Sequence, residues 1–145
     1  MHHRNILHRD IKTDNILILD DKNIKVCFAD FGFACKTNDT EKLKKACGTP
    51  GFIDPAVLKG GTHSSKSDIF SLGCLFFSLI SGKYLYNGAT FEEVLEKNKK
   101  NNPINYVRYS CEHASKECCS LLERMLDIDL GKRPTAKQCL NHSWF

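Results

Sequence analysis

The sequence predicts an α+β domain that is mainly α-helical and carries one small β-hairpin. Two short apolar runs near the start, separated by a polar turn, predict the hairpin. After Pro55, capped segments with apolar residues at helical spacing predict several helices. A length of 145 residues suits one domain with a sizeable core, and 41% hydrophobic with 26% charged residues is typical of a globular protein.

The hairpin comes first. Residues 16–19 are apolar, residues 20–23 read Asp-Asp-Lys-Asn, and residues 24–28 include β-branched side chains. We therefore expect two short strands joined by this turn. The stretch from Gly32 to Pro55 is polar, lacks periodicity and is broken by Gly and Pro, so we expect a long loop, which in a compact domain is usually functional or disordered.

A central helix is expected to run to about Ser81. Ser65 or Ser67 can cap its start, and Gly82 can end it. Its apolar residues leave almost no polar face, which indicates a buried helix.

Three more helices follow. Residues 90–93 form a capping box that opens a helix ending before Pro103, and the Lys-rich stretch 97–100 is expected to be a solvated helix face. Ser115 begins the next helix, and residues 135–138 form a second capping box that opens a short last helix. One apolar face of the Ser115 helix carries Cys118, Leu121, Leu122, Met125 and Leu126.

Composition excludes several classes of protein. The net charge of +4 is mild and its basic residues are scattered, so nothing favours nucleic-acid binding. The most apolar stretch, residues 72–80, is far short of the roughly 18–20 residues that span a membrane. Residues 1–5 have no apolar core and do not resemble a signal peptide. We expect a soluble, cytoplasmic protein without a membrane or nucleic-acid partner, with the nucleus as an open alternative.

The eight cysteines indicate free thiols in a reducing compartment, because their spacing is irregular and no secretory signal accompanies them. A zinc site was the alternative at Cys111, His113, Cys118 and Cys119. No second cluster completes the usual ligand spacing, so a zinc-binding module is the least favoured function.

Two motifs near the start carry the chemistry. Residues 8–15 read His-Arg-Asp-Ile-Lys-Thr-Asp-Asn, and fifteen residues after Asn15 comes Asp-Phe-Gly at 30–32. These fit H-R-D-x-K-x-x-N followed by D-F-G, so the chain resembles the eukaryotic serine/threonine protein kinases. The resemblance covers the whole chain. Residues 48–53 look like the family's substrate-docking segment and residues 68–73 like the start of its central helix. Residues 133–135 and 142–145 look like its last helix and ending. The ending and residues 48–52 are similar to the calcium/calmodulin-dependent group.

The resemblance implies ATP and Mg²⁺ as cofactors and a role for each motif residue. Asp10 would accept the proton of the incoming hydroxyl, and Lys12 would place positive charge near the transferring phosphate. Asn15 and Asp30 would bind Mg²⁺, because this hard cation prefers oxygen ligands. Leu17 would form the apolar floor under the adenine ring. Lys12 is also the residue that accompanies serine/threonine specificity in the family, and Thr49 in the docking segment points the same way.

Each role has a plainer alternative. An isolated Asp10 would be read as solvated or as a helix cap, and Leu17 as ordinary strand packing. Asp68 could simply cap a helix, although the resemblance favours a hydrogen bond to the backbone of the first motif. His8 and Phe31 are expected to pack in a buried stack.

Three departures from the family pattern stand out. The Gly-rich loop, strand Lys and helix Glu that precede H-R-D in the family are not in this chain. We expect a fragment that lacks the N-lobe, leaves Phe76 and Phe77 uncovered and transfers little phosphate alone. Ala56 replaces the Glu that pairs with the arginine matching Arg133, and Asp54 could compensate.

The third departure lies before Cys47, where residues 42–46 offer no hydroxyl for the phosphorylation that commonly switches kinases with an Arg at position 9. Lys44 or Lys45 is expected to repel Arg9. Constitutive activity and an inactive kinase both stay open on this observation.

The sequence thus predicts that residues 1–145 are a partial protein kinase domain, mainly the helical C-lobe, which phosphorylates Ser/Thr hydroxyls of protein substrates. The alternative is a non-catalytic, pseudokinase-like interaction module. That alternative is less favoured, because a degenerate scaffold need not retain Asp10, Lys12, Asn15 and Asp30 together.

Overall fold

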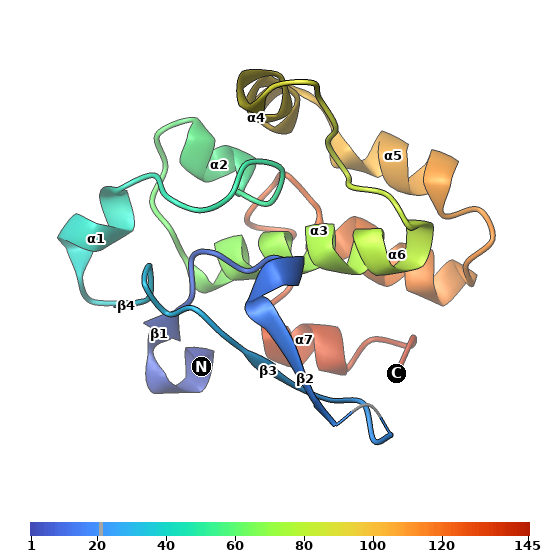
Figure 1. Cartoon of the computed structure of the whole chain (residues 1–145), viewed down its shortest axis with the longest axis horizontal. Helices are drawn as coiled ribbons and strands as arrows, with labels where there is room; N and C mark the ends of the chain where they lie inside the picture. The colour runs from blue at the N-terminus through green and yellow to red at the C-terminus, as the bar shows by residue number, and fades with distance from the viewer. Residues whose placement is uncertain (21) are drawn as a thin grey trace.

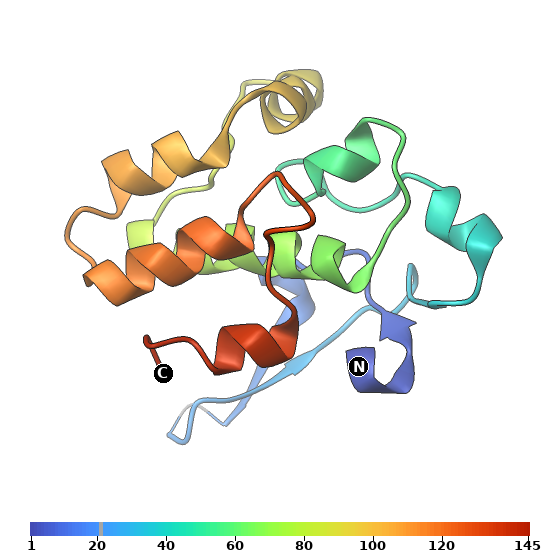
Figure 2. The same cartoon turned by 180° about the vertical axis from the view of Figure 1, so that it is seen from behind.

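The computed structural model describes residues 1–20 and 22–145, and it is organised around a long central helix, α3 (Ser65–Ser81). Figure 1 shows α3 through the middle of the molecule, with a hairpin extending below it and α4 at the opposite edge. In the opposite view, α6 lies alongside α3 (Figure 2), and the two helices are in contact. The other α-helices of the described residues are α1 (Thr40–Lys44), α2 (Pro55–Leu58), α4 (Phe91–Lys100), α5 (Pro103–Ser110), α6 (Lys116–Met125) and α7 (Ala136–Leu140).

The predicted hairpin is confirmed. Strands β2 (Ile16–Asp20) and β3 (Lys25–Phe28) pair antiparallel, with Ile16 opposite Phe28 and a bulge near the turn. Asp21, a residue of the predicted turn, lies outside the described residues. The pairing brings the start of β2 beside the end of β3, which matters for the site below.

The prediction of one long loop from Gly32 to Pro55 is wrong. Strand β4 (Cys35–Lys36) lies within it and pairs antiparallel with β1 (Ile6–Leu7), so the protein has a second two-stranded sheet. Helix α1 follows, capped by the side chain of Asp39, which accepts a hydrogen bond from a backbone N–H of its first turn. Pairing with a distant strand and a local cap thus order two parts of this stretch.

The predicted span of α3 is confirmed, but its cap differs. Ser64 is the N-cap, and Ser67 Oγ accepts a hydrogen bond from Ser64 N at 3.1 Å. Gly82 ends the helix with a φ of 68°, a left-handed conformation that glycine adopts without strain. Leu79 is 70% exposed, so the helix is not buried all round. No helix in the described part of the chain is long and apolar enough to cross a membrane.

The helices expected at residue 90, Ser115 and residue 135 are confirmed, each with its predicted capping side chain. Helix α5 was missed. Asn102 caps it, and Pro103 occupies its first turn. Proline suits this position, because the missing N–H would be unpaired there anyway. The same proline that ends the preceding helix therefore starts the next one.

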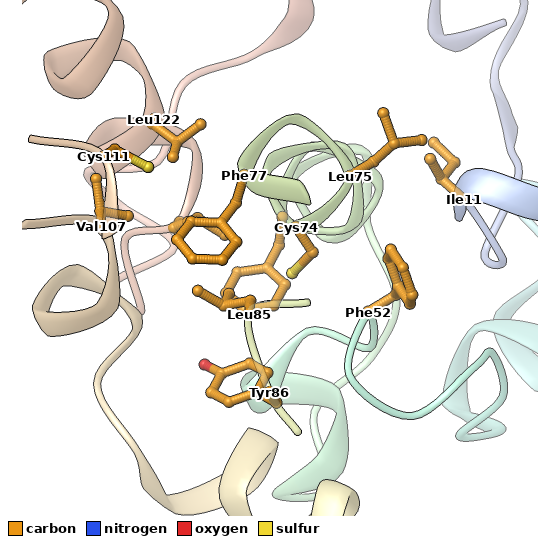
Figure 3. Packing of buried hydrophobic residues seen from close by; sticks show 12 residues of the cluster. Ile11, Phe52, Cys74, Leu75, Phe77, Leu85, Tyr86, Val107, Cys111 and Leu122 are labelled. Atoms are coloured by element: carbon orange, nitrogen blue, oxygen red, sulfur yellow. The ribbon is translucent and has the colours of Figure 1, made fainter. Parts of the chain in front are cut away.

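The core surrounds α3 and buries Phe77, which is 1% exposed (Figure 3). The expectation that Phe77 would be uncovered is therefore wrong. Its neighbour Phe76 packs against Trp144, with ring centroids 4.9 Å apart. Further buried members of this cluster are Ile11, Phe52, Phe70, Cys74, Leu75, Leu85, Tyr86, Val107, Cys111, Leu122 and Leu126.

Candidate active site

The loop of the first motif, residues 8–15 (the HRD loop), is anchored by Asp68 in the first turn of α3. Asp68 is 2% exposed, and its two carboxylate oxygens accept hydrogen bonds from the backbone N–H groups of His8 and Arg9, each at 2.9 Å. The ring of His2 lies 2.9 Å from the same carboxylate. The interpretation that Asp68 binds the loop backbone is confirmed.

Asp10, Lys12 and Asn15 converge inside this loop. Asp10 is 4% exposed, and its Oδ2 lies 3.2 Å from Asn15 Nδ2 and 3.5 Å from Lys12 Nζ. Asn15 Nδ2 also donates to the backbone oxygen of Asp10 at 2.8 Å. The hydrogen bonds that the Asn15 side chain makes within the described residues use its nitrogen, so the amide oxygen stays available to a cation.

Thr49 of the docking segment (residues 48–53) joins this cluster from outside the loop. Its hydroxyl donates to Asp10 Oδ1 at 2.7 Å and accepts from Lys12 Nζ at 3.0 Å. Sequence reasoning noted Thr49 only as a sign of specificity, not as a site residue. The Thr49 hydroxyl therefore lies between a carboxylate that accepts from it and an ammonium group that donates to it.

Asp30 is placed by the hairpin. Ala29 N donates to the backbone oxygen of Asn15 at 2.8 Å, and His8 Nε2 lies 3.0 Å from the oxygen of Ala29. Asp30 is exposed, has a φ of 55°, and accepts a hydrogen bond from Gly32 N at 3.1 Å. Asn15 and Asp30 therefore lie at the same end of the hairpin, although no contact joins their side chains within the described residues.

The apolar residues of the site differ in burial. Leu17 on β2 is 49% exposed, so its side chain is open to a ligand rather than enclosed in a core. His8 is fully buried and contacts Phe31, with ring centroids 5.1 Å apart. Phe31 is 52% exposed, so the prediction of a buried stack is correct for His8 and wrong for Phe31. An exposed ring at this point borders the same end of the hairpin as Asp30.

Asp54 replaces the missing glutamate. Its carboxylate makes a two-pronged ion pair with Arg133, at 2.5 and 3.1 Å, and both side chains are fully buried. Asp54 also caps α2 by accepting from Ala56 N at 2.9 Å. Arg133 lies over the ring of Phe70, 5.0 Å from its centroid. The predicted compensation by Asp54 is confirmed, and it ties the end of the docking segment to the core.

Arg9 makes hydrogen bonds to backbone oxygens that the sequence did not predict. Its guanidinium donates to the backbone oxygens of Phe33, at 2.6 Å, and Lys42, at 2.5 Å. Lys44 is 65% exposed and lies 3.6 Å from Glu41, and Lys45 is exposed as well, so the expected repulsion of Arg9 by Lys44 or Lys45 stays a prediction. Backbone carbonyls thus hold α1 against the HRD loop.

Two titratable side chains beside Arg9 have pKa values that depart from their ordinary values. Burial, followed by the nearby charge of Arg9, lowers the pKa of His63, and burial raises the pKa of the Cys47 thiol. Cys47 Sγ lies 3.6 Å from His63 Nε2. Both shifts favour the uncharged forms of these two side chains.

Comparison with known proteins supports the resemblance to protein kinases. The protein kinase domain family matches residues 1–145. Serine/threonine-protein kinase plk-1 of Caenorhabditis elegans is 37% identical over 145 residues, which are all of this chain and 21% of that protein. Calcium-dependent protein kinase 3 of Plasmodium berghei is 38% identical over 149 residues, covering 100% of this chain and 26% of that protein.

Myosin light chain kinase A of Dictyostelium discoideum is 32% identical, and the match covers 99% of this chain and 49% of that protein. The chain thus spans about a fifth to a half of the length of these relatives. The resemblance to serine/threonine kinases is confirmed, since relatives with that function in their names match the chain from end to end. In the HRD loop, Asp10 accepts a hydrogen bond from Thr49, and the family matches the whole length of the chain. The chain therefore belongs to the protein kinase domain family.

Proposed function

We propose that residues 1–145 are the C-terminal, catalytic-lobe part of a serine/threonine protein kinase that transfers the γ-phosphoryl group of ATP to hydroxyls of protein substrates. The observation that carries this proposal is the placement of Asp10 and Lys12 on either side of the Thr49 hydroxyl. An acceptor hydroxyl needs the same two neighbours: a base for its proton and a cation for the phosphoryl charge.

Asp10 is the proposed proton acceptor. Its carboxylate is held by Asn15 Nδ2 and Lys12 Nζ, so it is oriented before a substrate arrives. A substrate hydroxyl that reaches Asp10 would donate to it as Thr49 does and would lose its proton to it during transfer. Lys12, within reach of the same oxygen, would lie beside the charge that develops on the phosphoryl group.

The donor groups also suit ATP and Mg²⁺, which the family uses in general. Bound Mg·ATP supplies the phosphoryl group and part of its charge neutralisation. Asn15 and Asp30 would hold the metal, since an amide oxygen and an exposed carboxylate at one end of the hairpin are oxygen ligands. Within the described residues, no group of three or more His, Cys, Asp or Glu could hold a metal ion. Mg²⁺ needs none, because it keeps water and phosphate oxygens as ligands. Leu17 would contact the adenine.

We further propose that exposed apolar side chains of the hairpin pack against the upstream lobe of the kinase domain. These large apolar side chains are each about half exposed or more, an unfavourable state unless they are covered. They are Leu17, Ile18, Leu19, Ile24 and Val26.

The non-catalytic interaction module is not favoured. Such a module needs neither a buried carboxylate aimed at a hydroxyl nor a lysine paired with it. Asp10 and Asn15 are nevertheless 4% and 6% exposed, and the Asn15 amide nitrogen donates to both the carboxylate and the backbone oxygen of Asp10. Burying these polar groups is costly, and a passive scaffold would gain nothing from it.

The test is Asp10→Asn in the full-length protein. We expect the rate of phosphate transfer to a protein substrate to fall roughly 100- to 10,000-fold, because the amide cannot take the proton. Binding of Mg·ATP, measured by titration calorimetry, should persist, since Asn15, Asp30 and Leu17 are unchanged.

The control is Asp14→Asn, which alters an exposed carboxylate in the same loop and should leave transfer nearly unchanged. Equal loss of nucleotide binding and transfer in Asp10→Asn would contradict the role given to Asp10. A wild-type protein that binds nucleotide but transfers no phosphate would favour the non-catalytic alternative.

A further inference from the structure

Asn98 on α4 occupies a position that its helix does not explain. Residues 97–100 read Lys-Asn-Lys-Lys and were expected to form a solvated face. Lys97, Lys99 and Lys100 are exposed as expected, but Asn98 is fully buried, and it is the buried residue of α4. A buried amide in an otherwise polar helix calls for partners that satisfy it.

Those partners belong to the docking segment. Asn98 Oδ1 accepts a hydrogen bond from Gly51 N at 3.1 Å, and Asn98 Nδ2 donates to the backbone oxygen of Ile53 at 2.9 Å. One side chain therefore satisfies the N–H of Gly51 and the C=O of Ile53, two backbone groups of the same segment. These contacts join residues 45 and 47 positions apart in the sequence.

The segment needs such a clamp, because it belongs to no helix or strand. Gly51 has a φ of 88°, and a side chain there would be strained. A second clamp comes from α3, where Ser71 Oγ donates to the backbone oxygen of Phe52 at 2.7 Å. Two helices thus grip three consecutive residues, and Asn98 supplies two of the three hydrogen bonds.

The gripped residues lead directly to the reacting groups. Phe52 N donates to the backbone oxygen of Thr49 at 3.0 Å, and Thr49 in turn bonds Asp10 and Lys12. The path from Asn98 to Asp10 therefore runs through hydrogen bonds to Gly51 and Ile53, the covalent backbone of residues 51–53, and the hydrogen bonds from Phe52 to Thr49 and from Thr49 to Asp10. A shift of the docking segment would move the surface where a substrate chain must lie relative to Asp10.

We propose that Asn98 is a positioning residue that sets the docking segment for protein substrates. The inference rests on the proposed kinase function, and it assigns Asn98 to substrate docking rather than to nucleotide binding. It acts through the backbone of residues 51–53 and touches no reacting atom.

The experiment uses the full-length protein with Asn98→Leu, which keeps the size of the side chain and removes both hydrogen bonds. The matched control is Lys99→Ala, on the exposed side of the same helix. We expect Asn98→Leu to raise the KM for a peptide substrate about tenfold, the effect of losing buried hydrogen bonds. The KM for ATP should stay within about twofold of wild type, as should both KM values of Lys99→Ala.

A purely structural role gives another result. If Asn98→Leu only lowers the fraction of folded protein, kcat per total protein falls while the peptide KM stays unchanged, and the inference is overturned. Equal rises in the KM for peptide and for ATP would overturn it as well. A wild-type protein that transfers no phosphate would instead overturn the proposed function.

A measurement on the wild-type protein covers the case in which the variant does not fold. The amide hydrogen of Gly51 should exchange with solvent far more slowly than that of Gly60. Gly51 is buried and its N–H is held by Asn98, whereas Gly60 is exposed and its N–H is held only by a turn bond to the oxygen of Val57. Exchange of both at the same fast rate would show that the clamp does not form, and the inference would fail.

Discussion

The two halves of the candidate site are held in different ways. In the loop half, formed by Asp10, Lys12, Asn15 and Thr49, side chains bond one another, and Asp10 and Asn15 are 4% and 6% exposed. In the hairpin half, Leu17 and Asp30 are exposed. This half is placed mainly by its backbone, through the strand register and the bond from Ala29 to Asn15, and the Asp30 side chain adds one local bond from Gly32 N.

This difference follows the demands of the proposed chemistry. A proton acceptor must be oriented in advance, because a group that reorganises during the reaction loses most of its electrostatic benefit. A metal ligand and an adenine contact can be completed by the nucleotide itself, since Mg²⁺ brings water and phosphate ligands. The loop half is therefore built into the core, whereas the hairpin half offers a position and an open surface.

The largest expected effect comes from breaking the anchor of the docking segment with Asp54→Ala. The change strands the buried Arg133 guanidinium and should lower the free energy of unfolding by about 3–5 kcal/mol. Urea denaturation of the 145-residue chain measures it. The double variant Asp54→Leu with Arg133→Met should recover most of the loss, because apolar residues can replace a buried pair. A loss below about 1 kcal/mol in Asp54→Ala would mean that the pair does not anchor this segment.

A smaller loss is expected from Asp68→Asn, which weakens the anchor of the HRD loop. The amide can accept only one of the two N–H bonds from His8 and Arg9, so one buried donor loses its partner. We expect the free energy of unfolding to fall by about 2 kcal/mol. The exposed Asp14→Asn should change it by less than about 0.5 kcal/mol. If both substitutions proved equally harmless, the loop half would be no better held than the hairpin half.

The sequence predicted most of the features that depend on neighbouring residues. Helices α6 and α7 were found because Ser115 and Thr135 cap them within one turn. The hairpin was found because its two strands are adjacent in the chain. The motif residues Asp10 and Asn15 were found from their spacing, and the structure places them in contact.

Features that depend on distant residues and belong to no family motif escaped prediction. Strands β1 and β4 have two residues each, and their pairing joins Leu7 to Cys35, so no local pattern reveals them. Asn98 looks like part of a solvated face until the docking segment, some 45 residues earlier, is laid against it. Helix α5 was a different kind of error, since Asn102 and Pro103 did carry a local start signal that was read only as a stop.

The smallest expected effect concerns the hairpin half, through Ile18→Thr. Ile18 is 69% exposed, and threonine keeps the β-branched shape that suits a strand, so the free energy of unfolding of the 145-residue chain should change by less than about 0.5 kcal/mol. The matched substitution Ile11→Thr, at a residue only 5% exposed in the HRD loop, should cost about 1–3 kcal/mol, because it buries a hydroxyl in the core around α3.

Denaturant titrations of both variants, repeated in the full-length protein, sharpen the comparison between the two halves. If another lobe covers the hairpin there, Ile18→Thr should become clearly more costly in the longer protein while the cost of Ile11→Thr stays the same. An unchanged cost at Ile18 would show that the hairpin face stays open to solvent, and the proposal of an apolar cover would have to be abandoned.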